Sequence, residues 1–339
     1  MIEIIIKGGW KMKAVQITEF GGPEVLKLAE IEEPRPKENQ VKVKLYATGL
    51  NPSESYTISG TYAFNIPDLP YVPGYDGAGI IEEVGSDVKN LKVGDRVFLS
   101  AFSKEESTGT YAEKVAVNEN NVYPLPDHMT MNEGAALGIP AFTAYSALHQ
   151  KARIRAGEYV LIHGASGAVG TNAVQIAKAM GAIVIGTAST ERGRENILSL
   201  GADYAIPHVT EENKEELLEI TDNKGPDVII EFLANVNLET DSKVVANHGR
   251  IIVVGNRGTI EFTPRNLMVN EATITGMAFT QPDEEVLSEV VHGIKALIST
   301  GYLKPQIGKK FTLDEATEAH EHLMGSSGDG RTIFEIIKE

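Results

Sequence analysis

The first part of the chain carries the hydrophobic pattern of short β-strands. Apolar Val and Leu side chains alternate with Lys and Tyr over residues 41–46, which is the period of two of a half-buried strand. Turn-forming pairs, among them Asn51-Pro52, Pro73-Gly74 and Gly94-Asp95, separate the short apolar runs. Few helical periods occur before about residue 130. We therefore expect a small β-rich domain here.

From about residue 158 the pattern changes to strands that alternate with helices. A short apolar run precedes a glycine turn, and a stretch with helical period follows the turn. Such an alternation predicts βαβ units and a parallel sheet, hence a doubly wound α/β domain. The expected strands are 159–162, 183–185, 204–206, 228–230, 251–254 and 274–277, and the expected helices are 169–180, 191–200, 211–220 and 238–246.

The two ends of the chain are less regular. Near the C-terminus we expect helices over 284–299 and 314–323 and a last strand over 333–337. Residues 1–10 contain a short apolar run but neither the longer apolar region nor the cleavage site of a signal peptide. They form either a first strand or an extension before a second possible start at Met12. A length of 339 residues fits two domains of about 150 residues each.

Composition and charge narrow the classes of partner. The chain is 42% hydrophobic and 23% charged, as expected of a folded protein that buries a core. Its formal net charge of −16 argues against nucleic acid or an anionic membrane as the main partner, because a phosphate-backbone binder presents a basic face. No stretch approaches the about 20 apolar residues that span a bilayer. Without a targeting signal, the expected location is the cytoplasm.

A glycine turn over residues 163–170 (HGASGAVG) joins the first strand of the α/β region to its first helix. In a Rossmann domain such a turn binds the pyrophosphate of a dinucleotide, because the free amides of the helix N-terminus meet the phosphate charge. Gly167 lets the backbone approach the pyrophosphate, and Gly170 lets the helix pack on the strand. Ala165 occupies the first glycine position of the G-x-G-x-x-G pattern, so the match is not strict. The alternative is a plain βα turn without a ligand.

The end of the second strand indicates which dinucleotide binds. NAD sites usually place Asp or Glu there to accept a hydrogen bond from the ribose 2′-hydroxyl. This strand ends in residues 186–190, without an acid before Glu191. NADPH is therefore the expected cofactor, although the nearby arginines can also belong to a solvated helix start. The side chains that can bind a 2′-phosphate are Ser189, Thr190, Arg192 and Arg194.

Further motifs are distinctive in combination. They are 14–15, 20–26, 49–52, 74–79, 84–85, 94–97, 109–113, 138–145, 163–170, 233–238 and 253–261. Together they resemble the medium-chain dehydrogenase/reductases, in the quinone oxidoreductase branch and nearest to its ζ-crystallin type. The resemblance extends from Met12 nearly to the end of the chain.

The resemblance implies a GroES-like catalytic domain that is interrupted by a Rossmann cofactor domain. The catalytic domain would comprise residues 12–134 and 278–339, the NADP-binding domain residues 135–277, and the N-terminal extension residues 1–11. The active site would lie in the cleft between the two domains. The family also implies a homodimer or homotetramer, often built by joining the sixth strands near residues 273–277 of two sheets.

The resemblance implies cofactor contacts residue by residue. Tyr56 would reach the cofactor from the catalytic domain. Many family members bind the 2′-phosphate through a lysine near Gly193, which this chain lacks, so that Arg192, Arg194 or His208 would replace it. The contacts after the strands of the Rossmann sheet would be Ser166, Gly167, Ala168, Val169, Ser189, His208, Asn237, Val254, Gly255, Asn256, Arg257, Met277, Ala278 and Phe279.

Zinc, which alcohol dehydrogenases of this superfamily carry, is not expected. Asn51 stands in place of the first cysteine ligand, and Tyr75-Asp76 replaces the His-Glu pair of that family. The chain has no cysteine, so that thiolate zinc sites cannot form. His320 and His322 lie two apart on an expected helix and point in different directions, and we expect them to face solvent or to cap the helix.

Chemistry without a Lewis acid favours acceptors that spread negative charge by conjugation. The expected function is NADPH-dependent reduction of quinones, and the alternative is reduction of α,β-unsaturated carbonyls or enoyl thioesters. Asn51, Tyr56 and Thr143 are the candidate catalytic residues; Tyr56 either donates a proton or hydrogen bond or only contacts the cofactor. The resemblance also implies a non-enzymatic alternative, a structural role in the lens or binding of RNA. The net charge of −16 argues against RNA as the main ligand.

Overall fold

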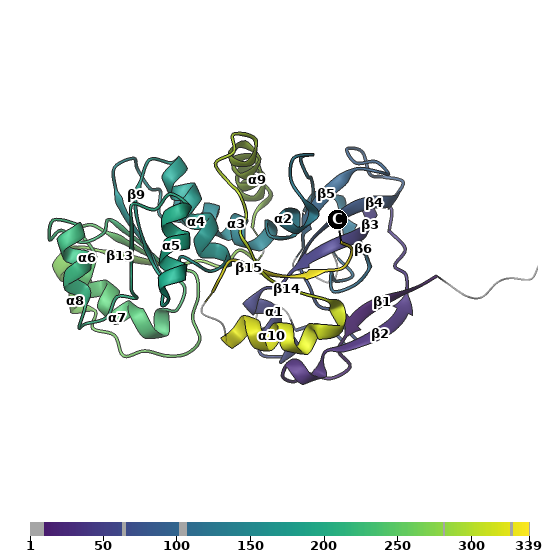
Figure 1. Ribbon diagram of the computed structural model, residues 1–339, viewed down its shortest axis with the longest axis horizontal. Helices are drawn as coiled ribbons and strands as arrows, with labels where there is room; N and C mark the ends of the chain where they lie inside the picture. The colour runs from purple at the N-terminus through teal and green to yellow at the C-terminus, as the bar shows by residue number, and fades with distance from the viewer. Residues whose placement is uncertain (1–9, 63–65, 102–106, 281, 326–327, 339) are drawn as a thin grey trace, which may run out of the picture. The chain divides into compact units, whose positions relative to one another are not determined.

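The structure is a computed structural model that describes residues 10–62, 66–101, 107–280, 282–325 and 328–338. The chain folds into two compact units, each described here by itself (Figure 1). The first unit takes residues 1–138, 309–326 and 332–339, and the second takes residues 139–308 and 327–331. Most of the expected extension over residues 1–11 lies outside the described residues, and its last residue, Lys11, already belongs to strand β1.

Antiparallel strands dominate the first unit, as the alternating pattern predicts. β1 (Lys11–Gln16) pairs with β2 (Lys27–Glu32). A seven-stranded sheet has the order β14-β15-β3-β4-β5-β7, with β6 paired to β3. Its strands are β3 (Gln40–Gly49), β4 (Asp76–Val84), β5 (Arg96–Ser100), β6 (Lys114–Asn118), β7 (Val122–Pro124), β14 (Ile307–Phe311) and β15 (Arg331–Glu335).

Strand β3 is more deeply buried than its alternation predicts. Lys42, on the polar face of the pattern, is only 7% exposed. Its ammonium group forms ion pairs with Glu83 and, at 3.6 Å, with Glu33. The strand pairs with β4, β6 and β15, so that neighbouring strands and their acidic side chains cover the lysine. Period alone could not reveal this pairing.

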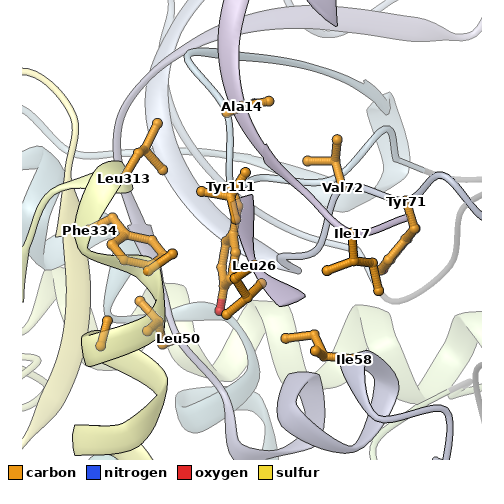
Figure 2. Packing of buried hydrophobic residues seen from close by; sticks show 14 of the residues in the cluster. Ala14, Ile17, Leu26, Leu50, Ile58, Tyr71, Val72, Tyr111, Leu313 and Phe334 are labelled. Atoms are coloured by element: carbon orange, nitrogen blue, oxygen red, sulfur yellow. The ribbon is translucent and has the colours of Figure 1, made fainter. Parts of the chain in front are cut away.

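Short helices complete the first unit and enclose a hydrophobic core (Figure 2). Tyr111 lies at its centre, with its ring edge-on to Phe334 at a centroid distance of 4.9 Å. Segments far apart in the sequence, from Ala14 to Phe334, thus pack together. The helices are α1 (Pro52–Ile58), α2 (Met131–Ala135) and α10 (Ala316–Gly325), with 3-10 turns at Pro23–Val25, Glu119–Asn121 and Leu313–Glu315.

The second unit contains the predicted parallel sheet, with strand order β10-β9-β8-β11-β12-β13. All its neighbouring strands are parallel. This is the 3-2-1-4-5-6 order of a doubly wound Rossmann sheet, which confirms the expected fold class. The strands are β8 (Tyr159–Ile162), β9 (Ile183–Thr187), β10 (Tyr204–Ile206), β11 (Val228–Glu231), β12 (Arg250–Val253) and β13 (Thr273–Gly276).

Helices connect the strands of this sheet. No helix among the described residues is long and apolar enough to cross a membrane. Helix α9 (Glu284–Ser299) has the expected bounds. Helix α7 (Ala234–Val244) begins before the expected residue 238, directly after strand β11. The others are α3 (Gly138–Tyr145), a π-helical segment (Ser146–Lys151), α4 (Ala168–Ala179), α5 (Glu191–Ser199), α6 (Lys214–Ile220) and α8 (Arg265–Asn270).

The second unit extends further along the chain than the predicted boundary at residue 278. Helix α9 and the segment after it pack on elements of this unit. A Cβ added to Gly293 would lie 2.2 Å from the ring of Tyr145, so that the ring packs on the helix backbone. Gln175 Nε2 also donates to the carbonyl of Lys304 at 3.1 Å. The observed return to the first unit is therefore at residue 309.

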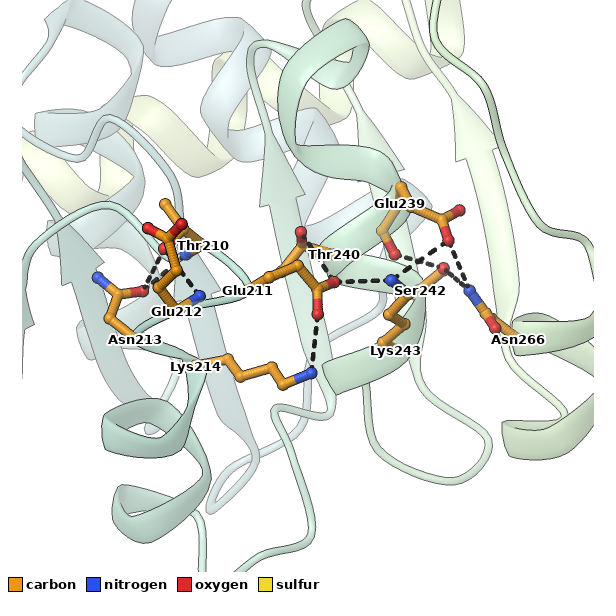
Figure 3. A network of polar contacts seen from close by, with 10 residues as sticks. All are labelled: Thr210, Glu211, Glu212, Asn213, Lys214, Glu239, Thr240, Ser242, Lys243 and Asn266. Atoms are coloured by element: carbon orange, nitrogen blue, oxygen red, sulfur yellow. Dashed lines mark hydrogen bonds and ion pairs between the residues drawn. The ribbon is translucent and has the colours of Figure 1, made fainter.

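Glu211, expected to begin a helix, instead lies in the loop before α6 (Figure 3). Its carboxylate accepts hydrogen bonds from Lys214 and Lys243, each at 2.8 Å. These two hydrogen bonds lower the pKa of Glu211 to about 2. Glu239 accepts a further hydrogen bond from the amide of Thr263 at 2.8 Å. Glu211 thus connects the β10–α6 loop to α7 through Lys243 and does not form the first turn of a helix.

Candidate cofactor site

The glycine turn lies between β8 and α4, as predicted, and its glycines differ in their surroundings. A Cβ on Gly170 would lie 2.5 Å from the carbonyl oxygen of Gly164, so that only glycine fits there. A Cβ on Gly167, the N-cap of α4, would meet only that same oxygen, at 3.3 Å. A Cβ therefore has room at Gly167 but not at Gly170.

Ala165, which breaks the glycine pattern, is fully buried. A Cβ on Gly186 of β9 would lie 2.9 Å from the Cβ of Ala165. The alanine therefore fits because the facing position in the second strand is glycine. Both residues are visible in the sequence, but their contact follows only from the pairing of β8 with β9.

The second strand holds the glycine turn from the side. Thr187 Oγ1 accepts a hydrogen bond from the amide of Gly164 at 3.1 Å and lies 2.8 Å from His208 Nδ1. The carbonyl of Thr187 accepts from the amide of Ala165 at 2.8 Å. Desolvation and the nearby charge of His163 lower the pKa of His208. The predicted adenine-side residue His208 is thus connected to the turn through one hydroxyl group.

The residues expected at the 2′-phosphate gather at the start of α5. Ser189 and Arg192 are exposed. Arg194 donates to the carbonyl of Ala188 at 3.2 Å, whereas Arg192 forms an ion pair with Asp329. Thr190 accepts from the amide of Gly193 at 3.0 Å and caps the helix. The segment that ends β9, residues 186–190, contains no acidic residue.

A buried cluster that sequence reasoning missed lies directly behind the turn. His163 Nε2 is 2.8 Å from Asp241 Oδ1 and 3.5 Å from Glu231 Oε2. All three residues are at most 2% exposed. Their ligand-type atoms lie within 4.8 Å of one another, as in a metal site. In the sequence, the sign of this cluster is Glu231, an acid at the end of the otherwise apolar strand VIIE.

Protonation explains how this cluster tolerates burial. Burial lowers the pKa of His163, but the carboxylates of Asp241 and Glu231 outweigh it and raise the pKa to about 9. Burial raises the pKa of Glu231 to about 7, despite the opposing charge of His163. At pH 7 the imidazole is charged, and its positive charge lies next to both buried acids.

Glu231 also accepts hydrogen bonds from the segment after β11, which carries the predicted cofactor residue Asn237. Its Oε1 accepts hydrogen bonds from the amide of Leu233 and, at 3.2 Å, from Asn237 Nδ2. The amide of Ala234 donates to the carbonyl of Gly255 at 3.0 Å. The amide of Arg257 donates to Asn235 Oδ1 at 2.8 Å. The segments after β11 and β12, which carry Asn237 and Val254–Arg257, are therefore interlocked.

The third predicted segment, Met277–Phe279, follows β13 and borders an open pocket of about 680 Å³ within the second unit. Phe279 is 7% exposed, and its ring packs against Phe142. The other predicted cofactor residues do not line this pocket. Thr143, on α3, is 6% exposed.

The candidate catalytic residues of the first unit lie around α1. Tyr56 is half-buried, and its ring stacks on Tyr62 at a centroid distance of 6.3 Å. Asn51 is 2% exposed, and its Nδ2 donates to Glu54 Oε1 at 3.1 Å and to Asp76 Oδ2 at 3.0 Å. Asn51 and Asp76, which stand at zinc-ligand positions of the resemblance, are thus bonded to each other.

His320 contradicts the sequence-based expectation of a solvent-facing or capping residue. It is 1% exposed, and its ring nitrogens lie 2.9 Å from Ser55 Oγ and 3.0 Å from the hydroxyl of Tyr111. Burial lowers its pKa to about 4, so the ring is neutral at pH 7. Helix α10 packs against α1, which covers the face that carries His320.

Comparisons with known proteins agree with this fold. Residues 37–127 match the family model described as alcohol dehydrogenase GroES-like domain, and residues 168–295 match the model described as zinc-binding dehydrogenase. The chain is 45% identical to the human quinone oxidoreductase over 95% of its own length and 97% of that relative. Escherichia coli quinone oxidoreductase 1 is 30% identical, with 94% of this chain and 98% of the relative covered.

Solved structures give the same picture. The Escherichia coli quinone oxidoreductase complexed with NADPH matches with a TM-score of 0.84 and 29% identity, over 95% of this chain and 99% of that one. The quinone oxidoreductase of Pseudomonas syringae matches with a TM-score of 0.84 and 31% identity over the same shares. The chain therefore belongs to the quinone oxidoreductase family of the medium-chain dehydrogenase/reductases.

Proposed function

We propose that this protein is an NADPH:quinone oxidoreductase that works without catalytic zinc. The observation that carries the proposal is the 45% identity to the human quinone oxidoreductase over 95% of the chain. The glycine turn at the N-terminus of α4 supports dinucleotide binding. The E. coli relative was solved with NADPH. The absence of an acid at the end of β9 supports NADPH over NADH.

Zinc independence rests on composition and local bonding. The chain contains no cysteine. Asn51 and Asp76, at the expected ligand positions, satisfy each other by a 3.0 Å hydrogen bond, and Ser100 donates to the other oxygen of Asp76 at 2.7 Å. Acceptors that delocalise negative charge need only modest hydrogen-bond donors, which fits a site of hydroxyl and amide groups.

When bound, NADPH supplies the reducing electrons. Gly167 and the amides that follow would hold its pyrophosphate. Glu231 accepts a hydrogen bond from Asn237 and so positions that side chain. Tyr56, which is half-buried on α1, is proposed to orient the acceptor. Within this scheme Tyr56 donates a hydrogen bond or proton to the acceptor oxygen.

NADPH oxidation with a panel of acceptors tests the function: 9,10-phenanthrenequinone, 1,4-benzoquinones, an alkenal and an enoyl thioester. The proposal expects the quinones to be turned over with the highest kcat/KM. Preferential turnover of the alkenal or the thioester would replace it with an enone or enoyl reductase on the same fold. Salt-dependent RNA binding that NADPH displaces, without turnover of any acceptor, would favour the non-enzymatic alternative.

NADPH is expected to raise the melting temperature more than NADH at equal concentration. A ligand that binds only the native state stabilises it by mass action, by about 2.7 kcal/mol at 100 times its Kd. Differential scanning fluorimetry with both cofactors measures the difference. Equal shifts would contradict the preference for NADPH.

Tyr56→Phe is expected to lower kcat about a hundredfold if the phenol donates a proton, since a positioned general acid contributes at least that much. The KM for NADPH should change little, because the ring and its stack on Tyr62 remain. Tyr62→Phe is the matched control, since it removes a hydroxyl from the neighbouring ring. Unchanged turnover in Tyr56→Phe would leave Tyr56 with a contact role only.

We propose that the protein forms a homodimer or homotetramer through the edge of the Rossmann sheet. β13 ends that sheet, so one of its edges has no partner strand among the described residues. The adjacent helix α8 exposes Met268 and Val269 by 75% and 73%. An unpaired edge next to exposed apolar side chains is a favourable surface for pairing with a second copy.

A further inference from the structure

A short segment, Gly328-Asp329-Gly330, lies against the glycine turn within the second unit. The amide of Gly330 donates to the carbonyl of Ser166 at 2.8 Å, and Gly330 forms a β-bridge with Gly167. A Cβ on Gly328 would lie 3.2 Å from the Cα of Gly167. Gly328 and Gly330 have φ angles of 73° and 79°, which favour glycine. The backbone therefore holds Asp329 at a defined place beside the turn.

The first turn of α5 borders the same place. A Cβ on Gly193 would lie 3.4 Å from Ser166 Oγ, and a Cβ on Gly328 would lie 3.7 Å from that atom. Arg192, next to Gly193, forms its ion pair with Asp329 here. The side chains of Arg192 and Asp329 are 78% and 42% exposed. An ion pair so open to solvent is weak, and a stronger anion can replace the carboxylate.

We propose that Asp329 is a specificity-determining residue that limits the preference for NADPH over NADH. The inference rests on the proposed NADPH binding. A 2′-phosphate that pairs with Arg192 must displace the carboxylate of Asp329. The displaced carboxylate stays close, because its backbone is bonded to the turn, and it repels the phosphate. NADH has a hydroxyl group at this position, so it neither displaces the carboxylate nor is repelled by it.

The variant Asp329→Asn tests this, because asparagine keeps the shape of the side chain and removes its charge. The ligands 2′,5′-ADP and 5′-AMP probe the adenosine end without the nicotinamide, and calorimetry gives their Kd values. The variant should bind 2′,5′-ADP about three- to tenfold more tightly relative to 5′-AMP. This gain should shrink at about 0.5 M salt, because the charges are exposed and salt screens them.

Two further variants separate local from general charge effects. Asp222→Asn makes the same charge change at an exposed residue near the amino end of β11, where φ is 52° and asparagine is tolerated. It should leave the ratio of the two Kd values unchanged. In an Arg192→Gln background, Asp329→Asn should give a smaller gain, because the two residues act on the same phosphate.

The outcomes distinguish this inference from the proposed function. If the wild type prefers 2′,5′-ADP and Asp329→Asn leaves that preference unchanged, the role of Asp329 is overturned while NADPH binding stands. If neither protein discriminates between the ligands, both proposals fail. If only the variant discriminates, Asp329 has the proposed role and the wild type uses both cofactors.

Discussion

His163→Asn is expected to lower the free energy of unfolding by about 3–5 kcal/mol, the cost of leaving buried charges without their partner. The imidazole lies 2.8 Å from Asp241 and 3.5 Å from Glu231, and both acids are fully buried. Asparagine can still form a hydrogen bond but cannot carry the compensating charge. Urea unfolding at pH 7 measures the loss.

His248→Asn is the matched control. His248 also pairs with an acid, Glu271 at 3.3 Å, but the two side chains are 66% and 71% exposed. The free energy of unfolding should change by less than about 1 kcal/mol. Similar losses in the two variants would show that the buried cluster contributes no more than a surface pair.

The same cluster should make the stability of the wild type fall as the pH rises. The pKa of His163 is raised to about 9, so its contribution is complete below pH 6.5 and is lost as the pH passes 9. The pKa of Glu231 is raised to about 7, so its contribution is lost between about pH 4.5 and 7. Urea midpoints at pH 6, 7.5 and 9 should decrease in that order, and His163→Asn should flatten the upper part. A loss of stability on adding a chelator would instead identify the cluster as a metal site.

Gly167→Val is expected to abolish measurable cofactor binding, with the Kd for NADPH rising at least about a hundredfold. The side chain would occupy the space where the pyrophosphate approaches the backbone. The fold should tolerate it, because φ at this N-cap is −78° and a Cβ meets only one atom within 4 Å, at 3.3 Å. NADPH fluorescence titration and the melting temperature measure the two effects separately.

Gly170→Val is the control for a structural defect in the same turn. Its Cβ would lie 2.5 to 2.8 Å from three backbone atoms of residues 164 and 165, which cannot move without displacing α4. This variant should lose both binding and melting temperature. If Gly167→Val also unfolded the protein, its loss of binding would say nothing about the pyrophosphate.

The sequence predicted most of the Rossmann sheet because parallel strands are continuous apolar runs of distinct length. All six strands form at the expected places, and α9 has the expected bounds. Prediction was weaker where a long-range partner decides the outcome. Lys42 and His320 are polar residues in patterns that place them outside, yet neighbouring strands and helices bury both.

Motifs predicted the segments that we propose contact the cofactor, but no motif predicted the buried cluster of His163, Glu231 and Asp241. His163 and Asp241 are 78 residues apart and meet only because β8 and β11 are adjacent in the sheet. Asp329 lies 137 residues from Arg192, and no period or motif connects the two. Topology brings such pairs together, and local pattern contains no information about them.

The contact between Ala165 and Gly186 constrains how this site can be altered. A methyl group on each would place their Cβ atoms 2.9 Å apart, so that the two positions cannot both carry side chains. A glycine at residue 165 would not by itself permit a larger residue at 186, because Ile197 also approaches that position at 2.5 Å. Engineering the cofactor preference at the end of β9 must therefore start after Gly186, because a side chain at residue 186 meets both Ala165 and Ile197.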